Sequence, residues 1–181
     1  MIRILKTVCR LIIGFIFCSS GTVLAVNSNL GLSPWDVFHQ GLSKITGISM
    51  GQVSIFVGLI VVIATIFLKL EIGLGTIANM ILIGVFMDVI SYTKIIPTSH
   101  NFFVSLLMLL GSLFTMAIGS YLYIGCEMGC GPRDGLMVAL VKKTGKPVGF
   151  IRSCIELGVL VIGFMLGGSV GIGTLITVFG V

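Results

Sequence analysis

Long apolar stretches alternate with short polar segments along the whole chain of 181 residues. A helix needs about 20 residues to cross a bilayer, and five stretches come close to that length. These stretches are 11–30, 50–68, 72–90, 102–124 and 148–166. The short alternating segments of a membrane β-barrel are absent from the sequence. The pattern therefore predicts an all-α, polytopic membrane protein.

Two polar segments between these stretches carry the signals of short helices, at 34–46 and 132–144. Each opens with Pro, has an Asp in its first turn and is followed by Gly, which are the positions that these residue types prefer. A helix of this length is about 18 Å long and cannot span the membrane. Each short helix is expected either to lie along the interface or to enter the membrane partway, and the sequence leaves both open.

The second half of the chain repeats the first after 98 residues, without a gap. The chain has only three Asp and four Pro, and two of each fall in register. The matching pairs include Gly31/Gly129, Pro34/Pro132, Asp36/Asp134, Lys44/Lys142, Gly47/Gly145, Gly73/Gly171, Gly75/Gly173 and Thr76/Thr174. We interpret 1–98 and 99–181 as two repeats within one membrane domain.

Each repeat is predicted to hold one hydrophobic helix, one short helix and two further hydrophobic helices. Because three crossings is an odd number, the second repeat should be inverted relative to the first. The sixth hydrophobic segment runs only from Gly171 to Val181 and is expected to be incomplete. Two explanations stay open, a truncated chain and a last helix that enters the bilayer partway.

Charge is scarce, because 56% of the residues are hydrophobic and only 9% are charged. With a cytoplasmic N-terminus, nine of the eleven Lys and Arg lie inside, and only Lys44 and Lys94 lie outside. The inner nine are Arg3, Lys6, Arg10, Lys69, Arg133, Lys142, Lys143, Lys146 and Arg152. The net charge of +5 therefore indicates membrane orientation rather than nucleic-acid binding. The first apolar stretch also has the charge pattern of a signal peptide, but its match to the fourth favours a retained helix.

Polar residues in the short helices are candidates for lining a substrate path, because half-helix N-termini near the midplane favour polar groups. The candidates are Trp35, Asp36, His39, Gln40, Arg133 and Asp134. The alternative is that both Asp residues only cap their own helices, and that His39 is an ordinary surface residue rather than a proton relay.

Two more candidates, Arg152 and Glu156, lie one turn apart inside the fifth apolar stretch. Charges there are costly, so we expect them to pair or to face a cavity. A structural ion pair and a contact to a substrate or coupling ion are both open. Asn79 and Asp88 are weaker candidates.

The paired motifs Gly73, Gly75, Thr76 and Gly171, Gly173, Thr174 open the third hydrophobic helix of each repeat. Close helix packing is favoured over a hinge or an unwound loop, since small residues let helices approach and Thr can bond a carbonyl. The five cysteines are interpreted as small buried hydrophobes, with a soft-metal site at Cys126 and Cys130 as the alternative. No metal, cofactor or catalytic motif is predicted, so we expect no enzyme.

The segment Gly31-Leu-Ser-Pro-Trp-Asp-Val-Phe-His-Gln-Gly-Leu42 resembles a signature of the YczE/YyaS/YitT-type family of bacterial membrane proteins. So do Thr46-Gly47, Gly73-Leu-Gly-Thr76, and Gly131-Pro-Arg-Asp-Gly135 with the later Lys143-Thr-Gly145. The likeness is greatest to the YczE branch. The resemblance implies a multi-pass protein of the bacterial plasma membrane whose members usually extend further at the C-terminus, and it implies no settled activity.

Two functional hypotheses follow. The first is a small-solute transporter or permease with a site between the repeats, whose partners are the lipid bilayer and a small solute or ion. The second is a non-catalytic accessory or scaffold protein that assists a partner enzyme or transporter. A chain of 181 residues is short for enclosing a path alone, so a homodimer is a further expectation, and the sequence does not select between a dimer and a single chain.

Overall fold

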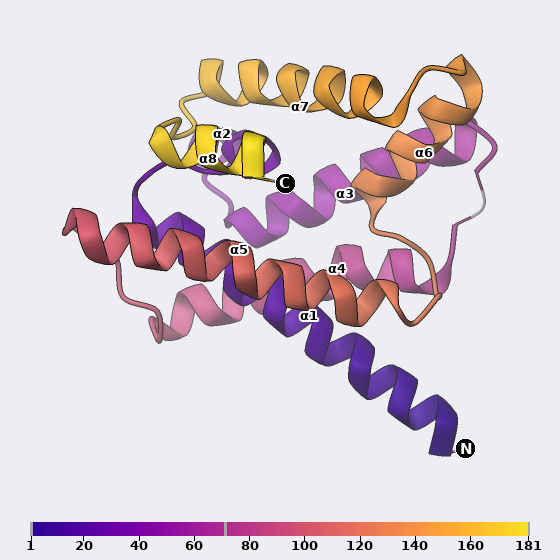
Figure 1. Ribbon diagram of the computed structural model, residues 1–181, viewed down its shortest axis with the longest axis horizontal. Coiled ribbons are helices and arrows are strands. Elements are labelled where there is room, and N and C mark those ends of the chain that lie inside the picture. The colour runs from indigo at the N-terminus through magenta and orange to yellow at the C-terminus, as the bar shows by residue number, and fades with distance from the viewer. Residues whose placement is uncertain (1, 71, 181) are drawn as a thin grey trace.

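The computed structural model describes residues 2–70 and 72–180, and this part of the chain folds into eight α-helices without a strand (Figure 1). In chain order they are α1 (Ile2–Ser28), α2 (Pro34–Thr46), α3 (Met50–Phe67), α4 (Leu74–Thr93), α5 (Phe102–Ile124), α6 (Pro132–Thr144), α7 (Val148–Met165) and α8 (Ile172–Gly180). The all-α prediction is confirmed. Two expectations fall partly outside the described residues, because the sixth hydrophobic segment ends at Val181 and the charge distribution includes the side chain of Arg3.

Five of the described helices, α1, α3, α4, α5 and α7, are long and apolar enough to cross a membrane. Their outer faces carry large hydrophobic side chains, of which Phe67 is 82%, Phe103 76% and Met165 79% exposed. An apolar surface of this extent suits acyl chains and not water. The described part of the last helix, α8, has nine residues.

The two short helices, α2 and α6, have the predicted bounds and 13 residues each. Both begin with Pro, and both are followed by a Gly in the left-handed conformation, Gly47 with φ of 73° and Gly145 with φ of 67°. Since a residue without a Cβ adopts this conformation at no steric cost, these glycines end the helices. Local signals in the sequence were thus sufficient to place both elements.

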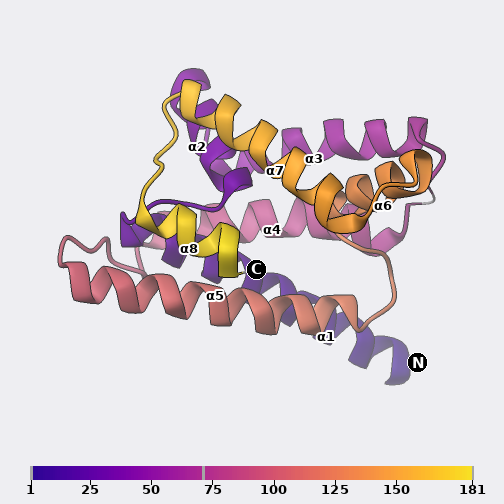
Figure 2. The same cartoon turned by 45° about the horizontal axis from the view of Figure 1, so that its top comes forward.

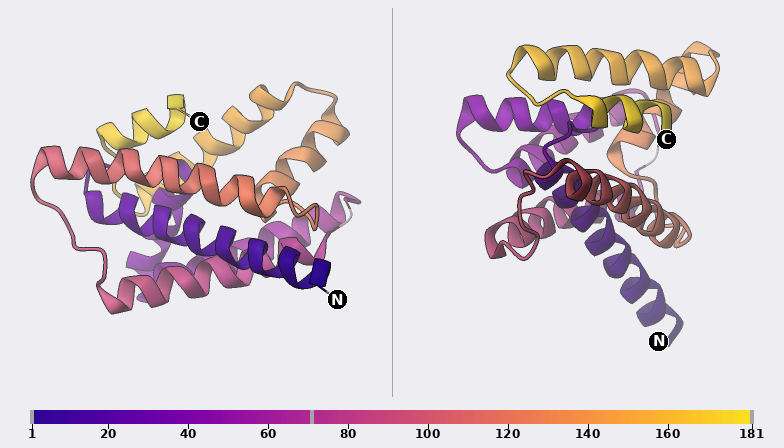
Figure 3. Two further views of the ribbon diagram at one scale, coloured as in Figure 1. Left: turned by 60° about the horizontal axis from the view of Figure 1, so that its bottom comes forward. Right: turned by 60° about the vertical axis from the view of Figure 1, so that its left-hand side comes forward.

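On one side of the molecule, α1 and α5 lie side by side and run in opposite directions (Figure 3). Glycines set how close they come. A Cβ on Gly14 would lie 3.0 Å from the carbonyl oxygen of Gly119, and one on Gly119 would lie 2.8 Å from the amide nitrogen of Cys18. Small residues thus bring the two backbones into contact, as is common between membrane helices. α4 also packs against α1.

The other side is built from α2, α3, α6 and α7, with α7 packed on α2 and α3 in contact with both α4 and α6 (Figure 2). The contact between α2 and α7 leaves no room for a side chain at Gly163. A Cβ there would lie 2.6 Å from the Cα of Phe38. The short helix α2 is therefore held by direct contact with the backbone of a full-length span.

The two glycine motifs exchange backbone hydrogen bonds between the halves of the chain. The amide of Gly75 donates to the carbonyl oxygen of Met128 over 2.8 Å, and the amide of Gly173 donates to that of Leu30 over 2.7 Å. The two donors, Gly75 and Gly173, are 98 residues apart in the sequence, and so are the two acceptors, Leu30 and Met128. Each linker that leads to a short helix is thus fixed by the first turn of a helix from the other half.

The glycine–threonine motif at α4 packs closely, as predicted. The Thr76 hydroxyl donates to the carbonyl oxygen of Cys130 over 2.6 Å, which confirms the expected bond from threonine to a neighbouring backbone. A Cβ at Gly73 would collide with the backbone of Met128. Facing this motif, Gly129 has φ of 118°, a conformation that only glycine adopts readily.

Candidate functional site: a cavity between the helices

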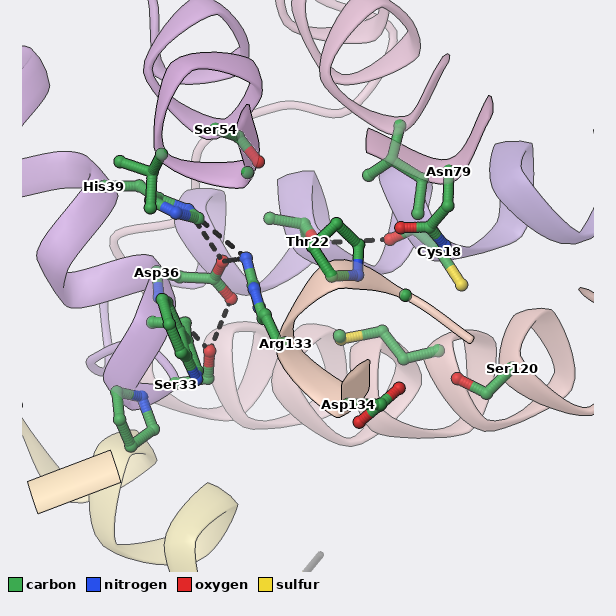
Figure 4. A pocket seen from close by; sticks show the side chains of 18 of the residues that line it. Cys18, Thr22, Ser33, Asp36, His39, Ser54, Asn79, Ser120, Arg133 and Asp134 are labelled. Atoms are coloured by element: carbon green, nitrogen blue, oxygen red, sulfur yellow. Dashed lines mark hydrogen bonds and ion pairs between the residues drawn. The ribbon is translucent and has the colours of Figure 1, made fainter. Parts of the chain in front are cut away.

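A cavity of about 300 Å³ lies at the centre of the helices. Each of the eight described helices contributes lining residues. The linkers that lead into α2 and α6 also contribute, with Ser33 and Gly131. Among the charged and polar groups that line it, Figure 4 labels Thr22, Ser33, Asp36, His39, Ser54, Asn79, Ser120, Arg133 and Asp134. Tyr123, Arg152 and Glu156 also line it. A polar cavity inside an apolar bundle is where function is expected in a membrane protein.

The first turn of α2 brings Asp36 to the cavity. The Ser33 hydroxyl accepts from the amide of Asp36 over 3.4 Å and donates to its carboxylate, at Oδ2, over 2.6 Å. Ser33 is therefore the N-cap of α2, and it also orients the carboxylate. Asp36 itself is only 3% exposed.

Asp36, His39 and Arg133 form a charged cluster that joins the N-terminal half of α2 to the first turn of α6 (Figure 4). Arg133 Nη2 lies 3.6 Å from Asp36 Oδ1 and 3.3 Å from His39 Nδ1. Because a guanidinium can only donate, Nδ1 of His39 accepts and the ring is neutral in this arrangement. The guanidinium also lies over the ring of Trp35, with its Cζ 5.2 Å from the centroid.

The corresponding turn of α6 is built differently. Its N-cap, Gly131, has no side chain to accept a hydrogen bond, and Asp134 receives one from elsewhere. The Tyr123 hydroxyl on α5 donates to Asp134 Oδ2 over 3.4 Å. Asp134 is half-buried and lies on the side of Arg133 that faces away from Asp36 and His39 (Figure 4).

Arg152 and Glu156 form the ion pair expected from their spacing along α7. Arg152 Nε lies 2.8 Å from Glu156 Oε1, and both residues line the cavity. The prediction that they pair or face a cavity is confirmed on both counts. Whether they contact a solute stays a prediction.

Gln40 is the one predicted path residue that does not line the cavity. Its side-chain Oε1 accepts from the amide of Ser169 over 2.7 Å, and the nearby Lys44 ammonium donates to the carbonyl oxygen of Gly167 over 2.7 Å. These two side chains tie the end of α2 to the linker before α8. The other seven candidates, Trp35, Asp36, His39, Arg133, Asp134, Arg152 and Glu156, all line the cavity.

Of the two weaker candidates, only Asn79 faces the cavity, and Asp88 has a structural position elsewhere. The Asp88 carboxylate accepts from the Ser49 hydroxyl over 2.5 Å and from the amide of Gly51 over 2.9 Å, and so caps α3.

Sequence reasoning missed Tyr123 and Ser120, which line the cavity from α5. The available signal was a hydroxyl-bearing side chain inside an apolar span, and it is weak because such residues also bond to their own helix. Among the described residues, no group of three or more His, Cys, Asp and Glu side chains that could hold a metal ion lies together.

The apolar spans, with a cavity between them that charged and polar side chains help to line, define an integral membrane protein of helical type. The chain matches the model of a "family of unknown function (DUF6198)" over residues 5–181, and it belongs to that family. No solved structure matches it.

Three similar proteins are all described as uncharacterized. An "uncharacterized protein" of Haemophilus influenzae is 35% identical over 94% of this chain and 78% of its own length. The "uncharacterized membrane protein YczE" of Bacillus subtilis is 35% identical over 91% of this chain and 76% of its own. The "uncharacterized protein YyaS" of the same organism is 30% identical over 92% and 84%. The resemblance read from the sequence motifs is confirmed for the YczE and YyaS types.

Proposed function

We propose that this protein is a small-solute transporter of the bacterial plasma membrane, with its substrate site in the central cavity. The observation that carries the proposal is that all eight described helices meet at this one cavity, where the first turns of two non-spanning helices bring the guanidinium of Arg133 to the buried carboxylate of Asp36. Transporters commonly place their sites between repeats, at the ends of interrupted helices. On this proposal the protein is not an enzyme.

The proposal includes an inverted repeat, in which α1–α4 correspond to α5–α8. Three observations support it. Spans α1 and α5 run antiparallel, and the exchanged bonds of Gly75 and Gly173 are equivalent under the 98-residue shift. Backbone conformations also match across the shift: φ is 110° at Gly31 and 118° at Gly129, and 55° at Asn29 and 54° at Glu127.

In this arrangement α2 and α6 are re-entrant helices that enter from opposite faces of the membrane. Their N-termini meet at the charged cluster, and their lysine-bearing C-terminal ends lie at the two surfaces. Backbone that does not span is tolerated inside a membrane only where protein or a water-filled cavity satisfies its polar groups, and both helices meet this condition.

The proposal is tested by measuring whether a reagent can reach the cavity from each side of the membrane. In a variant without the five natural cysteines, single cysteines at Ser54 and Met116 would line the cavity, and one at Leu157, an exposed position on α7, is the matched control. A membrane-impermeant thiol reagent is added to one side or the other of oriented membranes. We expect labelling of both cavity positions from each side, and none at the control.

Labelling of neither cavity position from either side would contradict a transport path. If an equimolar partner protein then co-purified with the chain, the function would be that of an accessory protein, the second hypothesis.

A further inference from the structure

The ionisable groups that line the cavity are not balanced. Three carboxylates (Asp36, Asp134 and Glu156) face two guanidiniums (Arg133 and Arg152), and the adjacent His39 accepts a hydrogen bond as a neutral ring. Glu156 pairs with Arg152 at 2.8 Å, and Asp36 pairs with Arg133 at 3.6 Å. No cationic side chain of the described residues lies within 4.0 Å of Asp134. The cavity therefore has one uncompensated negative charge.

An unpaired carboxylate inside a membrane protein is costly, and it is relieved by a proton or by a cation. Asp134 lies in the first turn of α6, at the end of the helix dipole that attracts negative charge. Tyr123 donates one hydrogen bond to it, at 3.4 Å. A cation that entered the cavity would supply the charge pairing that this carboxylate lacks within the described residues.

Asn79 provides an independent observation at the same place. It is 8% exposed and lines the cavity, and its side chain forms no hydrogen bond with the described residues. Because every fully buried side-chain nitrogen or oxygen of the described residues has a partner, the Asn79 amide is open to the cavity, where a ligand can form a hydrogen bond with it.

Three oxygen atoms converge around the N-cap of α6. The position that a Cβ would take on Gly131 lies 3.3 Å from Asn79 Oδ1 and 3.6 Å from the Tyr123 hydroxyl oxygen, and Asp134 follows one turn later. A carboxylate, an amide oxygen and a phenol oxygen can all accept hydrogen bonds. This acceptor-rich set complements a group with several N–H donors and a positive charge.

The cavity is larger than a bare ion requires, because its volume of about 300 Å³ is at the lower end of the range for small-molecule sites. Apolar side chains line the rest of it, among them Met80, Ile83 and Met116. An organic ligand would place its hydrocarbon part against these residues.

We infer that the cavity binds a small organic cation with N–H donors, whose ammonium group contacts Asp134 and Asn79 and whose apolar part lies along Met80 and Met116. The inference rests on the proposed function in taking the cavity as a solute site, and it adds the chemical class of the solute.

Binding is measured as thermal stabilisation of the full-length protein in detergent at pH 7, with n-butylammonium chloride as the probe. Butan-1-ol and sodium butyrate test the neutral and anionic forms of the same carbon chain, and sodium and potassium chloride at equal ionic strength test inorganic cations. A ligand that binds only the folded state raises the melting temperature by mass action. We expect a saturable increase with butylammonium alone.

Asp134→Asn removes the charge at constant shape and is expected to weaken butylammonium binding at least tenfold. Asp88→Asn is the matched control, because it removes a carboxylate that caps α3 outside the cavity. It should keep the affinity of the unchanged protein even if its own melting temperature is lower. Asn79→Ala is a second variant, expected to lose affinity several-fold, should Asp134→Asn fail to fold.

Equal affinity in the folded Asp134→Asn and Asn79→Ala variants would overturn the inference, and so would equal stabilisation by butan-1-ol or by sodium chloride. Failure of the proposed function gives a different result. Asp134-dependent binding without access to the cavity from both sides would leave the cation site in place and remove the transport role.

Discussion

Arg133 is a residue of α6 whose side chain contacts α2 directly and so joins the two short helices. It contacts Asp36 and His39 on α2 while its own backbone belongs to α6, and its guanidinium lies over Trp35. Removal of Arg133 leaves the carboxylate of Asp36, whose side chain is 4% exposed, without compensation, and this costs more than the pair contributes when intact. Removal of Asp36 costs less, because the Arg133 side chain is 38% exposed.

At this scale we predict energetic coupling between Asp36 and Arg133. Asp36→Asn and Arg133→Gln should each lower the free energy of unfolding, and the double variant should lose less than the sum. The expected coupling is about 1 kcal/mol or more, as for residues in direct contact. Unfolding in mixed micelles with increasing SDS measures it.

The control pairs Arg133→Gln with Asp88→Asn, two residues without a shared partner, whose effects should add within about 0.5 kcal/mol. A coupling of zero between Asp36 and Arg133 would mean that the 3.6 Å contact contributes nothing to stability.

At the scale of elements, the position of α2 depends on its contact with α7. Gly163 allows the two backbones to touch. Gly158, nearer the N-terminus of α7, has open space where a Cβ would be. The same helix therefore supplies a critical glycine and a neutral one.

We predict that Gly163→Ala is destabilising by about 1–3 kcal/mol, the usual cost of overpacking, because the added methyl group meets the backbone of Phe38. Gly158→Ala should be neutral or slightly stabilising, since alanine favours helix more than glycine by about 0.5–1 kcal/mol. Thermal unfolding of the two purified variants compares them directly. Similar melting temperatures for both would show that α2 is not held by this contact.

For the whole molecule, we predict the orientation that the distribution of lysine and arginine indicates. In the cysteine-free variant, a single cysteine at Thr98, in the linker between α4 and α5, should be labelled by an impermeant maleimide in intact cells. One at Lys143, near the end of α6, should be labelled only after the membrane is permeabilised. The reverse pattern would place the N-terminus outside.

The sequence was sufficient for features that local chemistry determines. The bounds of α2 and α6 follow from Pro34, Gly47 and their counterparts, and the pairing of Arg152 with Glu156 follows from helical spacing. It was not sufficient for contacts between distant segments. Nothing local indicates that Arg133 reaches Asp36, or that Tyr123 bonds Asp134.

Gln40 illustrates the same limit within a single helix. Its neighbour His39 lies in the cavity wall, whereas Gln40, about 100° further around α2, bonds the amide of Ser169. Which of two adjacent polar residues faces inward depends on how α7 and α8 cover the helix, and that depends on residues more than 100 positions later.

The exchanged backbone bonds have a consequence for how the protein is made. The ribosome releases Leu30 and Gly75 long before their partners, Gly173 and Met128, have been translated. The early helices must therefore wait in the bilayer as an open assembly, with the polar cavity wall still unshielded. Closure comes only when the later helices pack against them, as α5 does on α1 and α7 on α2, so the membrane-insertion machinery or the lipids themselves have to shelter this unfinished half during synthesis.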